Sequence, residues 1–188
     1  GEPVTPLANG GAFGGKVTSP VAADARRLAD EHGRPVRVLW AREDAVRLGP
    51  KRPPLAAGVS RDGSGTVRVV RTPGIADAFT PWTVEEVEVA GPPTSSALRA
   101  AGWAEAEVLR AGLRGAVGWV SAPGGGRATA EVAHGRIRVR LDAGEPMDEV
   151  VLRSYAIGAA HMALSWVCSE GLAVDDDGEV HDLTIRSF

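Results

Sequence analysis

The chain has 188 residues, of which 44% are hydrophobic and 24% charged, and it carries a formal net charge of −3. This length allows one ordinary domain or two small ones with a real hydrophobic core. The acidic balance disfavours a surface for nucleic acid or anionic membranes, which needs a basic excess. A single cysteine, Cys168, excludes a disulfide within the chain and a four-cysteine metal site.

The predicted cellular location depends on two kinds of segment, a membrane span and a signal peptide. No apolar run approaches the roughly 20 residues that span a bilayer, and the first residues do not follow the basic-then-apolar pattern of a signal peptide. We therefore predict a cytoplasmic protein with no membrane and no nucleic-acid partner. The four histidines lack the spacing of metal ligands on one helix face, so no protein-ligated metal is predicted.

Four helices are predicted from apolar periodicity and from capping residues. They cover residues 19–33, 42–48, 103–113 and 147–170. The first helix has Ser19 as its N-cap and ends at Gly33. Its apolar stripe consists of Val21, Ala25, Leu28 and Ala29. The last helix has apolar residues on most faces, so we expect it to be largely buried, Cys168 included.

Strands are predicted where apolar and polar residues alternate between turn residues. The predicted stretches are residues 35–40, 55–60, 66–72, 83–90, several short strands within 118–141, and a final strand over 179–188. The pair around Asp62-Gly63 indicates a hairpin, because both residues tolerate positive φ. Residues 175–178 are typical of a solvated turn.

The stretch NGGAFGGK, residues 9–16, places four glycines directly before a lysine. Glycine costs roughly 0.5–1 kcal/mol where alanine would serve, so the stretch indicates a close backbone approach or a turn that only glycine allows. One interpretation is a phosphate-binding P-loop, because Gly10, Gly15 and Lys16 satisfy most of its pattern. Val17 stands where that pattern needs a hydroxyl for magnesium. The other interpretation from these residues alone is a plain turn before a helix.

Several segments resemble, in order, the large molybdenum-binding subunits of the xanthine dehydrogenase and aldehyde oxidase family. The first is GGAFGGK (10–16), and Arg42-Glu43-Asp44 and Lys51-Arg52-Pro53 follow it. Residues 95–107, SSALRAAGWAEAE, are similar to the family's Ala-x-Arg-Ala-Pro-Gly segment and the helix after it. Residues 141–188 resemble its late Asp-x-Gly segment with a helix, an acidic turn and a strand.

This resemblance implies an α+β fold with mixed sheets and packed helices, like a molybdenum-hydroxylase cofactor-binding domain. It implies molybdopterin as the cofactor, in the dinucleotide form. The glycines of the loop would let backbone amides reach the anionic ligand sphere of that cofactor. The implied reaction is hydroxylation of aldehydes or N-heterocycles. The implied cofactor-binding residues are Gly11, Ala12, Phe13, Gly14, Gly15 and Arg99.

Three departures from the family pattern indicate a chain that is incomplete for catalysis alone. The family's middle section is reduced to a few residues here, and the glutamate that serves as general base would follow Phe188. Met162 stands where the family has a pterin-binding glutamine, and a thioether cannot donate the amide's hydrogen bonds. No catalytic residue is therefore assigned, and whether the chain is an enzyme by itself stays open.

We predict a glycine-loop lobe over residues 1–115 and a strand-helix-strand lobe over residues 116–188, with one compact domain as the alternative. The predicted function is a molybdenum-cofactor-binding domain. The alternative is a non-catalytic remnant or interaction subunit that retains the fold, and a P-loop-like nucleotide-binding protein ranks third. The expected partners are iron–sulfur and FAD subunits or a larger molybdenum-subunit chain, with a homo-oligomer as a further possibility.

Overall fold

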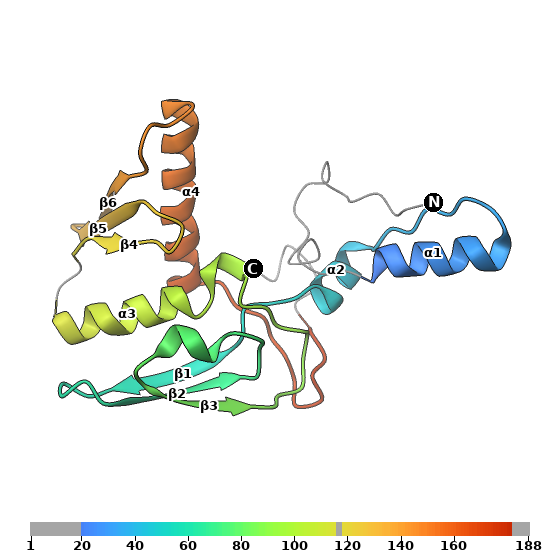
Figure 1. The fold of residues 1–188 in the computed structure, drawn as a ribbon, viewed down its shortest axis with the longest axis horizontal. Coiled ribbons are helices and arrows are strands. Elements are labelled where there is room, and N and C mark those ends of the chain that lie inside the picture. The colour runs from blue at the N-terminus through green and yellow to red at the C-terminus, as the bar shows by residue number, and fades with distance from the viewer. Residues whose placement is uncertain (1–19, 116–117, 182–188) are drawn as a thin grey trace. The chain divides into compact units, whose positions relative to one another are not determined.

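The computed structural model describes residues 20–115 and 118–181, apart from the side chain of Arg99 (Figure 1). Within these residues it has helices and two small sheets, which confirms the predicted mixed α+β class. The α-helices are α1 (Val21–His32), α2 (Arg42–Leu48), α3 (Trp103–Arg114) and α4 (Glu149–Cys168), and the 3-10 turns are η1 (Ala76–Phe79) and η2 (Leu98–Ala100). The strands are β1 (Leu55–Val59), β2 (Gly65–Val70), β3 (Thr83–Val87), β4 (Val120–Ser121), β5 (Arg127–Ala133) and β6 (Arg136–Asp142).

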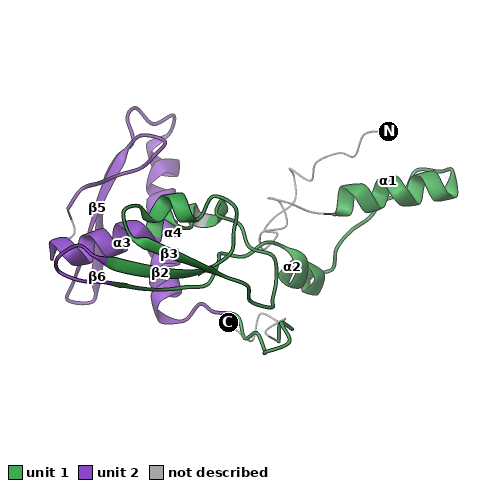
Figure 2. Ribbon diagram, turned by 60° about the horizontal axis from the view of Figure 1, so that its bottom comes forward, with its two compact units in different colours: residues 1–58, 65–104, 172–188 green, residues 59–64, 105–171 purple. Residues whose placement is uncertain are grey.

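The described residues fall into two compact units, which Figure 2 distinguishes by colour. Unit 1 comprises residues 20–58, 65–104 and 172–181. Unit 2 comprises residues 59–64, 105–115 and 118–171. The lobes over residues 1–115 and 116–188 stay a prediction.

Helix α1 lies close to its predicted range and stops where the sequence indicates. Gly33 takes the left-handed conformation with φ +60°, and its N–H donates to the carbonyl of Ala29. The proposed cap, Ser19, lies outside the described residues. The predicted apolar stripe is only half-buried, and α1 has no fully buried residue.

The strand predicted for residues 35–40 is wrong. These residues have no regular secondary structure, and the Leu39 side chain is 66% exposed. An alternating pattern stabilises a strand only when a neighbouring strand completes the hydrogen-bond ladder. No described strand lies beside this segment, so its alternation produces an extended connection between α1 and α2.

The sheet of unit 1 has the order β1-β2-β3. The turn between β1 and β2 is the predicted one, with Gly63 at φ +88° and the Asp62 carboxylate accepting from the Ser64 N–H at 2.9 Å. Strand β3 pairs with β2 in parallel, from Thr66↔Thr83 to Val70↔Val87. A parallel pair needs a crossover connection, and residues 71–82, including η1, provide it.

The buried core of unit 1 lies between β2 and this crossover. Val67 and Val69 on β2, together with Ile75 and Phe79, have side chains that are fully buried. Trp82 closes the same core with 7% exposure. Unit 1 holds most of the buried side chains of the described residues. Apolar burial of this kind is the main favourable term in folding.

The sheet of unit 2 has the order β4-β5-β6 and is antiparallel throughout. Its β5–β6 hairpin has two different faces, because side chains alternate along a strand. One face carries Ala128, Ala130, Val132, Ile137, Val139 and Leu141. The other face carries Arg136, Arg138 and Arg140 on the edge strand β6, and Arg138 pairs with Glu131 at 3.4 Å.

The prediction that the late helix is largely buried is wrong. Helix α4 forms as predicted, and the Asp148 carboxylate caps it by accepting from two N–H groups of the first turn. None of its residues is buried, and Cys168 is exposed. By length and composition alone α4 would suffice to cross a membrane. One such helix does not decide the location, which stays a prediction.

The last predicted strand is described only in part. An isolated bridge joins Val174 to Val180, and residues 182–188 lie outside the described residues. The acidic turn between the two valines forms as predicted. The Asp175 carboxylate accepts from the N–H groups of Asp177 and Glu179 and lies 2.7 Å from His181 Nε2. The hydrogen bond with His181 and those from the backbone lower the pKa of Asp175.

Substitution Gly102→Ala is expected to destabilise the protein by about 1–3 kcal/mol. Gly102 has φ +82°, and an added Cβ would lie 2.9 Å from side-chain atoms of Ala78 and Ile75. The matched control is Gly63→Ala, because Gly63 has a similar φ of +88° but open space around its Cα. Urea unfolding followed by circular dichroism gives both values. Equal losses in the two variants would contradict the steric part of this explanation.

Candidate functional site

The predicted cofactor-binding residues fall almost entirely outside the described part of the chain. Gly11, Ala12, Phe13, Gly14 and Gly15 all lie within residues 1–19. Arg99 has a described backbone, in the 3-10 turn η2, while its side chain lies outside the description. The structure therefore does not test whether these residues come together.

Two other family-like segments do come together, in unit 1. The Lys51 N–H donates to the carbonyl of Pro93 at 2.7 Å, and the Ser95 N–H donates to the carbonyl of Lys51 at 2.9 Å. Lys51 and Thr94 thus form an isolated parallel bridge. This bridge joins the Lys-Arg-x-Pro segment to the start of the segment that contains Arg99.

Hydroxyl groups fix the same segment to the end of β2. Thr72 is 1% exposed, and its hydroxyl donates to the carbonyl of Val70 at 2.9 Å. The Thr72 and Thr94 hydroxyl oxygens lie 2.6 Å apart. The Ser96 hydroxyl donates to the carbonyl of Pro73 at 3.0 Å. A buried hydroxyl needs such partners, so these bonds determine where the segment after Thr94 runs.

The side chain of Arg52 binds the backbone of the next turn, η2. Its guanidinium Nη1 donates to the carbonyl of Leu98, the first residue of η2, at 3.4 Å. Beyond Arg99 the backbone turns sharply, with φ +50° at Ala100 and φ +82° at Gly102. The lysine-arginine segment therefore positions the backbone beside Arg99 through a contact between Arg52 and Leu98, which are 46 residues apart in sequence.

Lys51 is the one described lysine, and its amine lies in a partly buried environment. Nζ donates to the carbonyls of Gly49 and Ala45, the latter at 3.4 Å. Burial disfavours the charged amine and lowers the pKa of Lys51 to about 8. An amine with this pKa is cationic at neutral pH yet loses its proton more readily than an ordinary lysine. It suits contact with an anion or proton exchange.

Other candidate sites in the described residues are weaker. No group of three or more histidine, cysteine or carboxylate side chains there is arranged to hold a metal ion. Unit 2 has an open hollow of about 480 Å³ between two turns, lined by residues that include Ser121, Gly125 and Gly144. Its charged side chains, Arg127 and Asp142, pair with each other at 3.2 Å.

Comparison with protein-family models, with curated proteins and with solved structures finds no match. The resemblance to the xanthine dehydrogenase and aldehyde oxidase family therefore stays a prediction from the sequence.

Lys51, Arg52 and Thr94 are not among the binding residues that the sequence predicts. The Lys-Arg-x-Pro segment is the signal in the sequence that points to the first two. Thr94 gives no signal in the sequence, because its role depends on a hydroxyl partner at Thr72.

Substitution Thr72→Val is expected to cost about 1–3 kcal/mol, because it leaves the Thr94 hydroxyl without its 2.6 Å partner. The double variant with Thr94→Val removes both hydroxyls and should recover part of that loss, giving a coupling of about 1 kcal/mol. Urea unfolding of the wild type, both single variants and the double variant measures it. Strictly additive losses would show that the two hydroxyls do not interact.

The Lys51 amine is expected to titrate near pH 8 in the folded protein. The chain has two lysines, Lys16 and Lys51, so ¹³C-dimethylation gives two lysine NMR signals beside that of the N-terminal amine, and Lys51→Arg assigns the signal of Lys51. The unfolded protein in urea is the control and should give the ordinary value near 10.5. Between these two pKa values the unfolded chain binds more protons, so the contribution of Lys51 to stability rises with pH across this window. A folded-state pKa near 10 would show that the Lys51 amine is not desolvated.

Proposed function

We propose that the chain is a molybdenum-cofactor-binding domain similar to the large subunit of the xanthine dehydrogenase and aldehyde oxidase family, and incomplete for catalysis alone. The observation that supports this proposal is the bridge between Lys51 and Thr94. It brings together two segments that the sequence resemblance assigns to one family, although neither the periodicity nor the composition of the chain requires them to meet.

The side chains near this bridge suit an anionic dinucleotide cofactor. Lys51 and Arg52 supply cations, and Ser95 supplies a hydroxyl group from the segment that the bridge holds beside them. Cations and hydroxyls are the usual partners of phosphate oxygens. The backbone amides of Gly11–Gly15 would hold molybdopterin, which would supply the hydroxylation chemistry when bound.

Partner chains are part of the proposal. Met162 stands where the family has a pterin-binding glutamine, so a larger molybdenum-subunit chain would supply that contact. Iron–sulfur and FAD subunits would carry the electrons away. We propose a cytoplasmic location for this assembly.

A second candidate is a non-catalytic interaction subunit that retains the fold. The observation that favours it is α4, which is apolar along most of its length and has no buried residue. Such a helix normally lies in a core or against another surface. A docking role needs neither the cofactor nor the missing general base.

The decisive measurement is the molybdenum content of the folded protein, produced in a host that makes the cofactor. We expect about one molybdenum per chain by mass spectrometry, and a loss of about tenfold or more in Gly14→Val, because valine would block the approach of the amides. The control is Gly58→Val, since Gly58 lies in β1 with open space for a side chain.

Three outcomes separate the candidates. Molybdenum bound by the wild type and by Gly58→Val, but lost from Gly14→Val, supports the cofactor-binding domain. A folded wild type without molybdenum that co-purifies with a larger chain favours the interaction subunit. Tight binding of magnesium and ATP would instead favour the P-loop interpretation of residues 10–16.

A further inference from the structure

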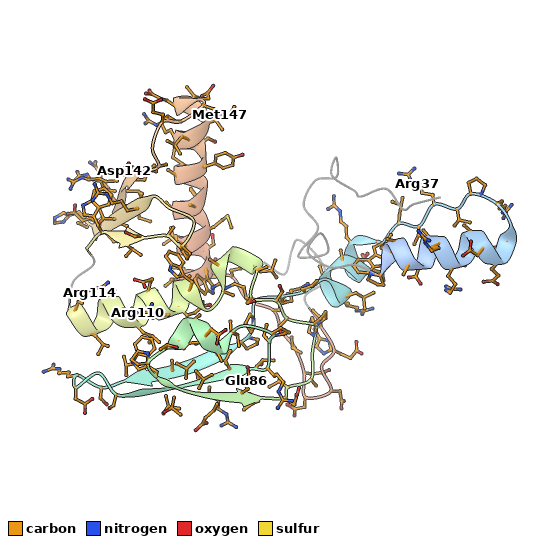
Figure 3. The ribbon with its side chains drawn as sticks, viewed as in Figure 1. Arg37, Glu86, Arg110, Arg114, Asp142 and Met147 are labelled. Carbon is orange, nitrogen blue, oxygen red and sulfur yellow. The ribbon has the colours of Figure 1, made fainter. Side chains whose placement is uncertain are left out.

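The edge strand β6 carries a row of arginines. Side chains alternate between the two faces of a strand, so Arg136, Arg138 and Arg140 share one face of β6. All three side chains are exposed. Figure 3 shows nitrogen-bearing side chains gathered beside the β5–β6 hairpin, near the labelled Asp142. The row places a cation at every second residue along one edge of the sheet of unit 2.

Carboxylates of unit 2 neutralise only part of this row. Arg138 pairs with Glu131 on β5 at 3.4 Å. The residues opposite Arg136 and Arg140 on β5 are uncharged. Among the described residues, neither Arg136 nor Arg140 takes part in an ion pair. The charges of these two arginines are therefore available to an anionic partner.

The turn between β5 and β6 determines which backbone groups of β6 point outward. It consists of His134 and Gly135, with φ +50° and +70°, and such a two-residue turn closes on a hydrogen-bonded pair, here Ala133 and Arg136. Hydrogen-bonded and non-hydrogen-bonded pairs alternate along an antiparallel ladder. The arginines of β6 therefore direct their N–H and C=O groups towards β5.

The backbone groups that point away from β5 belong to the apolar residues between the arginines. Ile137 and Val139 are two of these residues, and no described strand lies on their outward side. Helix α4 contacts β6, but the one half-buried residue of β6 is Leu141, which lies on the apolar face. The outer edge of β6 thus offers a hydrogen-bonding backbone between an apolar face and a cationic face.

We propose that this edge binds an acidic, extended segment of a partner protein, which joins the three-stranded sheet beside β6 and runs antiparallel to it. The backbone of the segment hydrogen-bonds to Ile137 and Val139. Its carboxylates, at every second residue, lie opposite Arg136, Arg138 and Arg140. Strand addition of this kind takes affinity from the backbone and specificity from alternate side chains. This inference goes beyond the proposed function and does not depend on a cofactor.

The register favours ion pairs across the new edge. When the backbone bonds form at Ile137 and Val139, the positions opposite the arginines become non-hydrogen-bonded pairs. The Cα atoms of such a pair are about 4.5 Å apart, against about 5.5 Å in a hydrogen-bonded pair. Opposite charges at directly opposed positions stabilise two strands. The apolar residues of the incoming strand then lie on the other face, beside the half-exposed side chains of Ile137 and Val139.

Other occupants fit this edge less well. The acidic stretch of this chain at residues 85–88 already pairs with Arg71 through Glu86 and Glu88. A nucleic acid offers phosphates to the arginines but no ladder of N–H and C=O groups to the backbone of β6. The net charge of −3 also disfavours a nucleic acid. An acidic polypeptide from another chain uses both the cations and the backbone.

Fluorescence anisotropy of a labelled peptide mixed with the full chain tests the binding. The probe is the peptide Gly-Glu-Val-Glu-Val-Glu-Gly, whose carboxylates alternate with valines. We expect a dissociation constant of about 100 µM or below at low salt. The double variant Arg136→Gln with Arg140→Gln should weaken binding by about fivefold or more, because it removes two cross-strand ion pairs.

The control is the double variant Arg37→Gln with Arg68→Gln. It removes the same charge from exposed arginines of unit 1 and should leave the affinity within about twofold of the wild type. Circular dichroism checks that both double variants stay folded. Equal weakening by the two would show that the peptide responds only to net charge, and the proposal would be wrong.

N-methylated peptides test the backbone part of the proposal. In the proposed register the N–H groups of the two valines face β6, whereas those of the glutamates point away from it. N-methylation of both valines should weaken binding by about tenfold or more, while N-methylation of two glutamates should have little effect. Hydrogen exchange followed by NMR gives a second readout. Saturating peptide should slow exchange at the amides of Ile137 and Val139 by about tenfold, and should leave that of Arg138 unchanged.

Three further outcomes would overturn the proposal. One is equal binding of both N-methylated peptides, which would exclude strand addition. Another is a deoxythymidine decamer that binds more tightly than the peptide and is lost in Arg136→Gln with Arg140→Gln, which would make the arginine row a nucleic-acid surface. The last is a dimer in sedimentation equilibrium that the same double variant dissociates, because a second copy of this chain would then occupy the edge.

Discussion

The arrangement of unit 1 depends on the short backbone bridge between Lys51 and Thr94, supported by the buried hydroxyl of Thr72. The bridge joins the segment that leads to Arg99, which follows β3, to the residues just before β1. The Lys51 amine lies in a partly buried place against the carbonyls of Ala45 and Gly49, where desolvation lowers its pKa. The backbone of Lys51 thus fixes the path of a distant segment, while its amine is held by residues near it in sequence.

Local elements could be predicted from the sequence wherever a local cause determines them. Gly33 ends α1 because it adopts positive φ, and Asp62-Gly63 turns the β1–β2 hairpin for the same reason. Burial could not be predicted in this way. The apolar composition of α4 suggested a core position, but the amount of surface that packs against a helix depends on the whole chain and on its partners. The segment at residues 35–40 failed for a related reason, because a strand needs a neighbour that its own sequence does not specify.

The candidate site was predictable in part. The sequence resemblance singled out the Lys51-Arg52 segment and the segment around Arg99, and the structure adds that they lie in contact. The sequence could not indicate the hydroxyl pair of Thr72 and Thr94, because threonine is common and only tertiary structure places two of them within hydrogen-bond distance. The glycine loop at residues 10–16 remains a prediction, and so does the cofactor that it implies.

The alternating arginines of β6 have a consequence for how copies of this chain can meet. An edge strand exposes unpaired backbone groups, and two such strands can pair and join their sheets. When two copies of β6 approach, Arg136, Arg138 and Arg140 of one strand face the same residues of the other, and like charges repel. The like charges along this edge thus disfavour aggregation through β6. Pairing of two β6 edges would join the two sheets into one continuous sheet, and the arginines oppose that step.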